Sequence, residues 1–214
     1  ICAFETNVLG SAKVFDLAER HKVKRVVIIS TDKAICPTSV MGATKRLSER
    51  IALERRYNDT EFLVVRFGNV LDSSGSVIPL FKEQIKGGGP VTVTSEHVTR
   101  YFMSIPEAVD LVLQAGAIGK NGEIMVLDMG EPVRIYDMAK KIIELSGFIP
   151  GKDIDIKIIG MRPGEKEYEE LLTDEEKVHR TPYDRIFVAK KLSVNAEPVS
   201  LAKIAEAIDR NDSN

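Results

Sequence analysis

The chain has 214 residues, of which 43% are hydrophobic, and its 30 basic and 32 acidic side chains leave a formal net charge of −2. A chain of this length buries one sizeable core or two small ones, and its charge balance gives no sign of a nucleic-acid or membrane-surface partner. Its apolar runs are too short for a bilayer span, and no secretory signal is visible. The two cysteines and three histidines are scattered, which indicates reduced intracellular thiols and no metal site.

The chain opens with the pattern of an amphipathic helix. Apolar residues recur at helical spacing, and no capping residue precedes them. They are Ala3, Val8, Ala12, Phe15 and Ala18.

A buried strand then leads into a polar loop. Residues 26–29 are all Val or Ile, a continuous run of the kind that a parallel sheet buries on both faces. Four polar residues follow: Ser30, Thr31, Asp32 and Lys33. In open α/β sheets the carboxyl ends of the strands are where ligands bind. The next helix carries Met41 and Lys45, which lie one turn apart on the same face. We expect the chemistry of the chain in this stretch.

The rest of the chain alternates helices and strands, which is typical of an α/β fold. The predicted helices cover 44–57, a short segment through Phe81 and Ile85, a segment that begins at Pro106 and Glu107, 135–145, and about 200–210. The predicted strands cover 61–68, the VTVT segment at 91–94, 123–127 and 154–159, and 69–79 is expected to be a loop. Gly87, Gly88 and Gly89 precede Pro90 and a strand, so we interpret them as a turn and not as a phosphate cradle.

The stretch from Arg25 to Arg46 resembles the active-site segment of the extended short-chain dehydrogenase/reductase family, which places Ser or Thr after this strand and a Tyr-x-x-x-Lys pair on the next helix. Here the register gives Thr31, Met41 and Lys45, so the Lys matches and the Tyr does not. The Asp-Lys pair after the Thr, the segment PTSVMGATKR and the later RPGEK are similar to nucleotide-sugar 4,6-dehydratases of bacterial capsule and O-antigen lipopolysaccharide biosynthesis. In the group that acts on UDP-N-acetylglucosamine, Met commonly replaces the Tyr. The resemblance covers about residues 1–192.

The resemblance implies the C-terminal part of a Rossmann-type doubly wound parallel sheet with a smaller α/β substrate-binding region. We assign 1–80 to the C-terminal half of the dinucleotide-binding domain and 81–192 mainly to a nucleotide-sugar-binding region. Within 81–192, the segment 105–146 returns to the Rossmann sheet. The remaining residues, 193–214, form a tail helix. A Gly-rich phosphate loop and a ribose-reading residue are missing from the sequence. We therefore expect a C-terminal piece of a longer protein whose upstream part supplies most of the cofactor site.

The resemblance also implies NAD or NADP as cofactor, contacted by Lys45, Ser30 and Phe67. Lys45 would hold the nicotinamide ribose and place positive charge beside the oxygen being oxidised, and Thr31 would donate a hydrogen bond to that oxygen. Because the thioether of Met41 is a weak acceptor, Asp32 is the candidate for accepting the C4 hydroxyl proton and releasing it to the departing C6 hydroxyl.

The residue after Asp32 bears on stereochemistry. Lys33 would act as the base at C5. Retaining dehydratases carry Glu at this position, so the Lys resembles the subgroup that inverts C5.

Substrate anchors are expected further along the chain. By resemblance, Asn69 meets the sugar or diphosphate, Arg100 and Arg162 grip the diphosphate, and Glu165 accepts from the uridine ribose hydroxyls. A planar guanidinium with fixed donors suits a diphosphate. Asn7 is expected to bridge the sheet, and Cys36 to line or cover the site.

The resemblance implies a UDP-N-acetylglucosamine 4,6-dehydratase that is a cytoplasmic homo-oligomer, and the charge balance indicates no nucleic-acid partner. We expect membrane attachment, if the parent protein has any, only through a region N-terminal to this chain. That region would anchor the parent in the inner membrane, with the present chain on the cytoplasmic side. One alternative is a UDP-sugar 4-epimerase, although epimerases normally keep the Tyr and lack the Asp-Lys pair. Another is a non-catalytic UDP-sugar-binding module, in which Met41 marks lost chemistry.

Overall fold

The computed structural model describes residues 1–55, 59–73, 75–172, 178–189 and 198–210. The chain divides into two compact units. Unit 1 comprises residues 1–67, 111–128 and 170–214, and unit 2 comprises residues 68–110 and 129–169.

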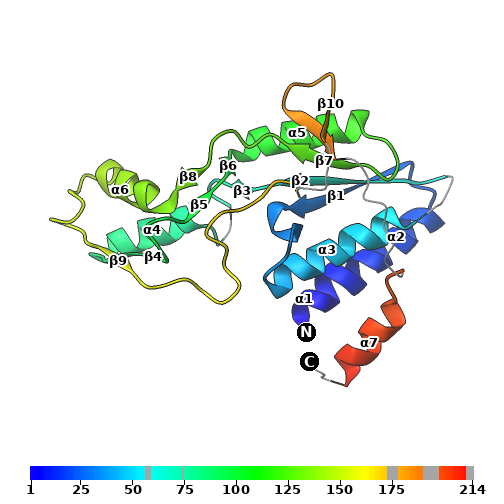
Figure 1. Ribbon diagram of the computed structural model, residues 1–214, viewed down its shortest axis with the longest axis horizontal. Helices are drawn as coiled ribbons and strands as arrows, with labels where there is room; N and C mark the ends of the chain where they lie inside the picture. The colour runs from blue at the N-terminus through cyan, green and yellow to red at the C-terminus, as the bar shows by residue number, and fades with distance from the viewer. Residues whose placement is uncertain (56–58, 74, 173–177, 190–197, 211–214) are drawn as a thin grey trace. The chain divides into compact units, whose positions relative to one another are not determined.

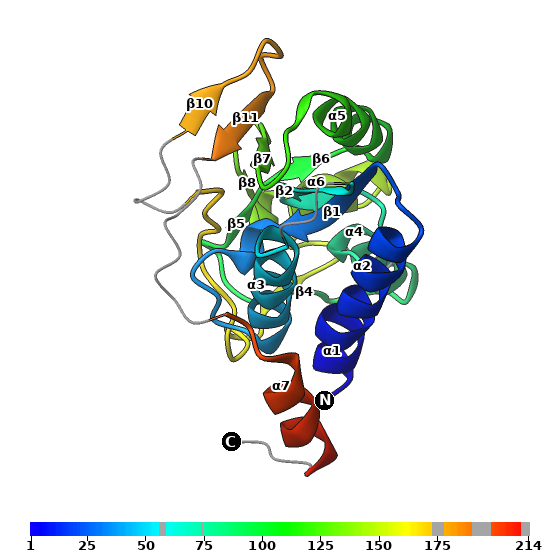
Figure 2. The same cartoon turned by 90° about the vertical axis from the view of Figure 1, so that its right-hand side faces the viewer.

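Unit 1 is built on a five-stranded sheet with the strand order β1-β2-β7-β11-β10 (Figure 2). The strands are β1 (Arg25–Thr31), β2 (Glu61–Phe67), β7 (Ile124–Leu127), β10 (Val178–Arg180) and β11 (Ile186–Ala189). Strands β1, β2 and β7 run parallel, and β11 and β10 continue the sheet antiparallel. Thr31 lies opposite Phe67, so the carboxyl ends of β1 and β2 meet at one edge. Leu63, Val64 and Val65 are fully buried, as the continuous apolar pattern of β2 predicts.

Helices cover both faces of the parallel strands. The helical elements of this unit are α1 (Cys2–Phe4), the π-helix η1 (Glu5–Gly10), α2 (Ser11–Arg20), the 3₁₀ turn η2 (Asp32–Ala34), α3 (Val40–Leu53), the C-terminal part of α5 (Ile105–Ile118) and α7 (Leu201–Asp209). Helices α2 and α3 lie side by side on one face, and α5 lies on the other (Figures 1 and 2). Gly116 of α5 approaches β1 so closely that an added Cβ would stand 3.1 Å from a methyl group of Val27.

The core of unit 1 confirms the pattern of the first helical segment. Val8, Ala12 and Phe15 are buried against residues of β1, β2 and α3, and Ala18 is buried as well, whereas Ala3 is only half buried. The segment is not one continuous α-helix, because η1 interrupts it. An added Cβ at Gly10 would stand 3.2 Å from the carbonyl oxygen of Glu5, so the missing side chain leaves room for this wider turn.

The helix predicted at 44–57 begins earlier, at Val40, and ends at Leu53. The prediction overlooked Ser39, whose hydroxyl caps the helix by accepting from the amide of Gly42 at 3.2 Å. Tyr57, the predicted end, lies outside the described residues.

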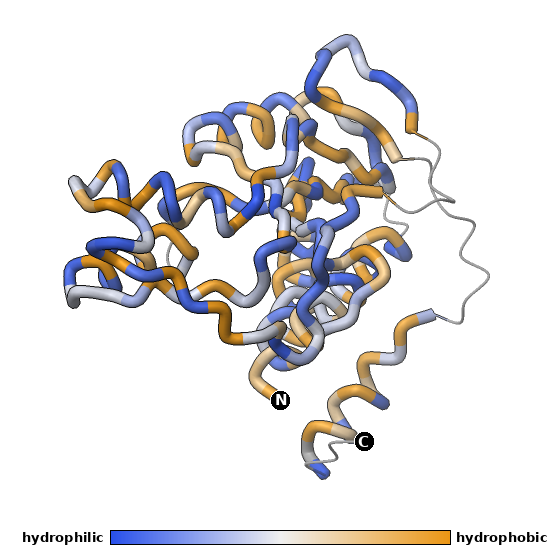
Figure 3. Tube along the Cα trace, turned by 60° about the vertical axis from the view of Figure 1, so that its left-hand side comes forward, coloured by the Kyte–Doolittle hydropathy of each residue, from blue (hydrophilic) through white to orange (hydrophobic). Residues whose placement is uncertain are grey.

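Helix α7 agrees with the prediction of a helix at about 200–210, and Ser200 caps it by accepting from the amide of Lys203 at 3.4 Å. Apolar and polar residues alternate along it (Figure 3), and its apolar side packs on the core of unit 1 through Leu201 and Ile204.

Unit 2 contains short parallel and antiparallel strand pairs and two complete helices. Its elements are β3 (Asn69–Val70), α4 (Val77–Lys86), β4 (Val91–Val93), β5 (Thr99–Arg100), β6 (Phe102–Met103), the N-terminal part of α5, β8 (Val133–Arg134), α6 (Ile135–Leu145) and β9 (Ile156–Ile158). Strand β3 pairs with β6 and β4 with β9 in parallel, and β5 pairs antiparallel with β8. A separate core packs α4, β4 and α6 together.

Three predictions in unit 2 need comment. The glycines at 87–89 form a turn between α4 and β4, as expected. The strand predicted at 154–159 is shorter, because Ile154 forms only an isolated bridge with Pro150 and Gly160 leaves the strand conformation at φ +88°. The expected loop at 69–79 includes β3 and the first turn of α4. Within the described part of the chain, no helix combines the length and apolar character needed to cross a membrane.

Candidate active site

The side chains of Thr31, Asp32 and Lys33 form a hydrogen-bonded cluster where β1 ends and η2 begins. Thr31 Oγ1 donates to Asp32 Oδ1 at 2.8 Å, and Lys33 Nζ donates to the same oxygen at 2.9 Å. Asp32 is 0% exposed. Its other oxygen, Oδ2, is buried and has no hydrogen-bond partner among the described residues. A buried polar atom without a partner is unusual in folded proteins, and a catalytic role is one accepted explanation.

Helix α3 brings Lys45 to the same strand. Lys45 Nζ donates to the carbonyl oxygen of Ile29 on β1 at 2.6 Å. Burial lowers the pKa of Lys45 below its ordinary value of 10.5, and the negative charge of Glu49 opposes this change. Met41, one turn earlier, is 42% exposed. The side-chain amide of Asn7 donates to Thr44 of α3 at 3.0 Å, and its expected bridging of the sheet stays a prediction.

Gly42 sets the distance between helix α3 and the turn η2. A Cβ at this position would stand 2.2 Å from the carbonyl oxygen of Lys33 and 3.2 Å from Cβ of Pro37. Helix α3 can therefore pack against η2 only because residue 42 has no side chain. Cys36, in the same loop, is exposed and has a φ of +40°.

A buried ion pair supports this edge of the sheet, and the sequence analysis missed it. Glu49 of α3 accepts from Arg66 of β2 through both of its oxygens, each at 2.8 Å. Ser30 Oγ also donates to Glu49, at 2.5 Å. The signal in the sequence was an arginine inside the apolar strand EFLVVRF, because a buried charge needs a partner.

Two expected cofactor contacts lie at this edge. Ser30 is 4% exposed and its hydroxyl is bound to Glu49, whereas Phe67, at the end of β2, is half buried. Their roles toward a cofactor stay predictions, as do the catalytic roles of Thr31, Asp32 and Lys33.

The expected substrate anchors belong to unit 2, where three of them lie together. Arg100 Nη2 donates to Glu165 Oε1 at 3.3 Å, and the backbone amide of Arg162 donates to Glu165 Oε2 at 3.1 Å. Thr94 also donates to Glu165, at 3.0 Å. Arg162 is exposed, but Arg100 is buried and donates to the carbonyl oxygens of residues 99 and 167.

Asn69 is placed at β3, where its side chain donates to the carbonyl of Tyr101 at 3.1 Å. The binding roles of the four expected anchors stay predictions.

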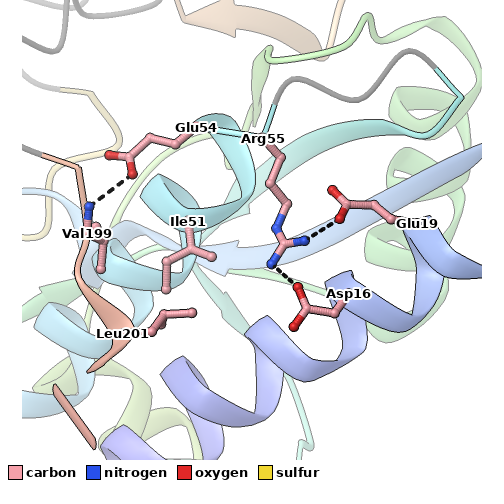
Figure 4. Close-up of a pocket in the computed structure, with 7 residues that line it drawn as sticks. All are labelled: Asp16, Glu19, Ile51, Glu54, Arg55, Val199 and Leu201. Carbon is pink, nitrogen blue, oxygen red and sulfur yellow. Dashed lines mark hydrogen bonds and ion pairs between the residues drawn. The ribbon is translucent and has the colours of Figure 1, made fainter. Parts of the chain in front are cut away.

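A pocket of about 390 Å³ lies elsewhere in unit 1 (Figure 4). It is lined by Asp16, Glu19, Ile51, Glu54, Arg55, Val199 and Leu201. Arg55 points between Asp16 and Glu19 and donates to both, at 2.6 and 2.7 Å. None of the residues discussed above for catalysis lines this pocket.

Comparison with known proteins identifies the family of this chain. The family model described as "Polysaccharide biosynthesis protein" matches residues 1–191. The capsular polysaccharide biosynthesis protein CapD of Staphylococcus aureus is 54% identical over 190 residues, which are 88% of this chain and 32% of CapD. A UDP-glucose 4-epimerase of Rickettsia canadensis is 42% identical over 178 residues, which are 81% of this chain and 51% of the epimerase. The chain thus spans about a third to a half of these relatives.

A solved structure agrees with the fold. The dTDP-glucose 4,6-dehydratase DesIV of Streptomyces venezuelae, crystallised with NAD and TYD, matches 78% of this chain and 57% of its own chain, with a TM-score of 0.71 and 21% identity. This likeness and the parallel sheet of unit 1 confirm the expected α/β fold of Rossmann type. The chain therefore belongs to the polysaccharide biosynthesis protein family, within the extended short-chain dehydrogenases/reductases.

Proposed function

We propose that this chain carries the catalytic residues of a UDP-sugar 4,6-dehydratase, which converts UDP-N-acetylglucosamine to a 4-keto-6-deoxy product with inversion at C5. The observation that carries the proposal is the Thr31–Asp32–Lys33 cluster. One carboxylate oxygen of Asp32 is bound by two donors, and the other is buried with no partner in the part of the chain that the structure describes. The cluster stands at the carboxyl end of β1, which is the ligand-binding edge of such sheets.

The residues at this edge fit a nicotinamide cofactor, NAD or NADP. Lys45 offers a partly buried amine beside the end of β1, and Phe67 offers an aromatic ring at the end of β2. When bound, the cofactor would take a hydride from C4 of the sugar and return it to C6. The hydroxyl of Ser30 donates to Glu49, and its contact with the cofactor stays a prediction. The bound NAD of DesIV supports the choice of cofactor.

Asp32 and Lys33 would carry the protons. Asp32 accepts the proton of the C4 hydroxyl through Oδ2, and Thr31 and Lys33 hold Oδ1 meanwhile. Because Oδ2 is shielded in this structure, the contact forms only once substrate has turned the carboxylate toward the sugar. Lys33, once its ammonium has released a proton to solvent, removes the proton from C5. Asp32 then protonates the departing C6 hydroxyl, which leaves as water. Lys33 keeps the proton it took, and C5 regains a proton from solvent on the face opposite Lys33, as inversion requires.

The substrate assignment rests on relatives and on unit 2. The Rickettsia relatives are named for a UDP-sugar. In unit 2 the carboxylate of Glu165 accepts from the side chain of Arg100 and from the backbone amide of Arg162. We propose that Arg162, which is exposed, binds the diphosphate, and that Arg100, Glu165 and Asn69 complete the nucleotide-sugar site. The homo-oligomeric state and the cytoplasmic location stay predictions.

A 4-epimerase is the second candidate, because relatives with 42% identity carry that name. Met41 argues against it: the thioether stands where epimerases have the Tyr base, and it cannot take the proton of the C4 hydroxyl. The Asp32–Lys33 pair supplies instead the acid and base that loss of water requires. A binding module without catalysis would keep UDP-sugar affinity but show no turnover.

Mass spectrometry of the sugar nucleotide after incubation with the full-length protein tests the proposal. We expect a product lighter by one water, and Asp32→Asn should abolish it while UDP-sugar binding persists. Asp137→Asn, which changes an exposed carboxylate in α6, is the matched control and should leave turnover at the wild-type level. A product of unchanged mass would favour the epimerase.

A further inference from the structure

We infer that Glu49, paired with Arg66, is a positioning residue of this site: the pair fixes the Lys45-bearing helix against the ends of β1 and β2. The inference deepens the proposed function and rests on it for its catalytic meaning.

The contacts of Glu49 join three elements. Its Oε1 accepts from Ser30 Oγ at 2.5 Å and from Arg66 Nε at 2.8 Å. Its Oε2 accepts from Arg66 Nη2 at 2.8 Å and from Arg46 Nη1 at 3.2 Å. A single carboxylate thereby ties α3 to the last residues of two parallel strands, where the candidate catalytic groups begin.

The burial of the pair indicates that its purpose is not stability alone. The side chains of Glu49 and Arg66 are 1% and 0% exposed. Removing two charges from water is costly, and apolar residues of similar volume often replace such a pair without loss of stability. What apolar residues cannot reproduce is the geometry of a bidentate guanidinium–carboxylate pair, which fixes both distance and orientation.

The pair acts on catalysis through its neighbours. Ser30, which it holds, is followed directly by Thr31 and Asp32. Lys45 lies one helical turn before Glu49, and its amine reaches the backbone of β1 at Ile29. If the pair is lost, α3 and the strand ends can shift relative to each other, and the amine of Lys45 is no longer held on the carbonyl oxygen of Ile29.

The test compares stability with turnover in the full-length protein. The double variant Glu49→Leu/Arg66→Met replaces the pair by apolar side chains, and we expect its melting temperature to stay near or above that of the wild type. We expect kcat to fall about tenfold to a hundredfold, because misplacement of reacting groups by about 1 Å costs on that order, and KM for the sugar nucleotide to change little. The matched control is Glu206→Leu/Arg210→Met, which removes an exposed pair of α7 and should leave kcat unchanged.

A stable double variant with wild-type kcat would overturn the inference, because a merely structural pair can be replaced by apolar packing. Ser30→Ala serves if the double variant does not fold, since it cuts only the link to β1. We expect it to lower kcat severalfold at constant KM, and unchanged kcat would overturn the inference.

A readout without turnover separates this inference from the proposed function. Lys45 is labelled with an amine-selective reagent and quantified by peptide mass spectrometry. We expect faster labelling in the double variant and in Ser30→Ala than in the wild type, because the amine is no longer held on Ile29. Unchanged labelling overturns the positioning role even where the wild type dehydrates its substrate. A wild type that forms no dehydrated product refutes the proposed function, and the labelling still decides the role of Glu49.

Discussion

Gly42→Ala should damage catalysis although alanine is the better helix former. In the interior of a helix, Gly→Ala is worth about 1 kcal/mol in favour of alanine. At Gly42, however, the new Cβ would stand 2.2 Å from the carbonyl oxygen of Lys33, whereas Cβ atoms do not approach closer than 3.0 Å. The difference, about 0.8 Å, must be taken up by α3 or by η2. Because the obstacle is backbone, no side-chain rotation can relieve it.

The two opposing terms give the expected magnitudes. Overpacking costs about 1–3 kcal/mol, so the net loss of unfolding free energy should be about 0–2 kcal/mol. The activity should suffer more, because η2 carries Asp32 and Lys33, and a shift of about 1 Å can cost about 10²-fold in rate. The assay is kcat and KM of the full-length protein, together with urea unfolding.

Gly87→Ala is the matched control for this variant. Its added Cβ meets backbone oxygens at 3.5 and 3.6 Å, and φ is −80°, so alanine fits without displacement. We expect kcat and stability near wild-type values. If Gly42→Ala keeps kcat within about twofold of wild type, the reasoning that links this glycine to the placement of Asp32 and Lys33 is refuted.

Three further predictions concern the same site. Lys33→Ala, like Asp32→Asn, should lower the dehydration rate by about 10²–10⁴ while binding of the UDP-sugar, measured by calorimetry, changes only a few-fold; near-normal turnover would sink the assigned roles. Met41→Leu should keep most activity, since a volume-conserving exchange of hydrophobic side chains usually costs less than about 1.5 kcal/mol of stability. Met41→Tyr should bring no tenfold gain in turnover, because Asp32 already takes the proton of the C4 hydroxyl. A collapse in the first variant or a large rise in the second would contradict this route. Burial lowers the pKa of Lys45 below 10.5, so the folded protein releases this proton at a lower pH than the unfolded chain. The wild type should therefore gain unfolding free energy relative to Lys45→Met as pH rises toward 10.5, and a difference independent of pH would speak against the effect.

The sequence predicted local features of the fold well. The β-branched run at 26–29 and the apolar stretch before Arg66 are strands in the parallel sheet, because both patterns report burial on two faces. The strands β10 and β11 were missed, since segments of three or four residues carry little periodic signal. Strand β11 forms through pairing with β7, which is far away in the sequence, and β10 pairs only with β11. The early start of α3 followed from a cap, Ser39, that the prediction did not use.

In the candidate site, too, local features could be predicted from the sequence and contacts between distant segments could not. The placement of Thr31, Asp32, Lys33 and Lys45 near the end of one strand could be predicted. These residues are close in sequence, and only β1, the turn η2 and helix α3 carry them. The pairing of Glu49 with Arg66 could not be read from periodicity, because it depends on how α3 lies on β2. Arg100 meets Glu165 across 65 residues, a contact that only the tertiary structure provides.

The most direct test of the account follows the hydrogen at C4. UDP-N-acetylglucosamine carrying deuterium at C4 is incubated with the full-length protein, and the product is analysed by mass spectrometry and NMR. The proposed dehydration predicts loss of one water, with the deuterium retained and found at C6, because the hydride taken from C4 is returned within the same turnover. A product of unchanged mass with deuterium still at C4 would contradict dehydration and assign the site to epimerisation instead.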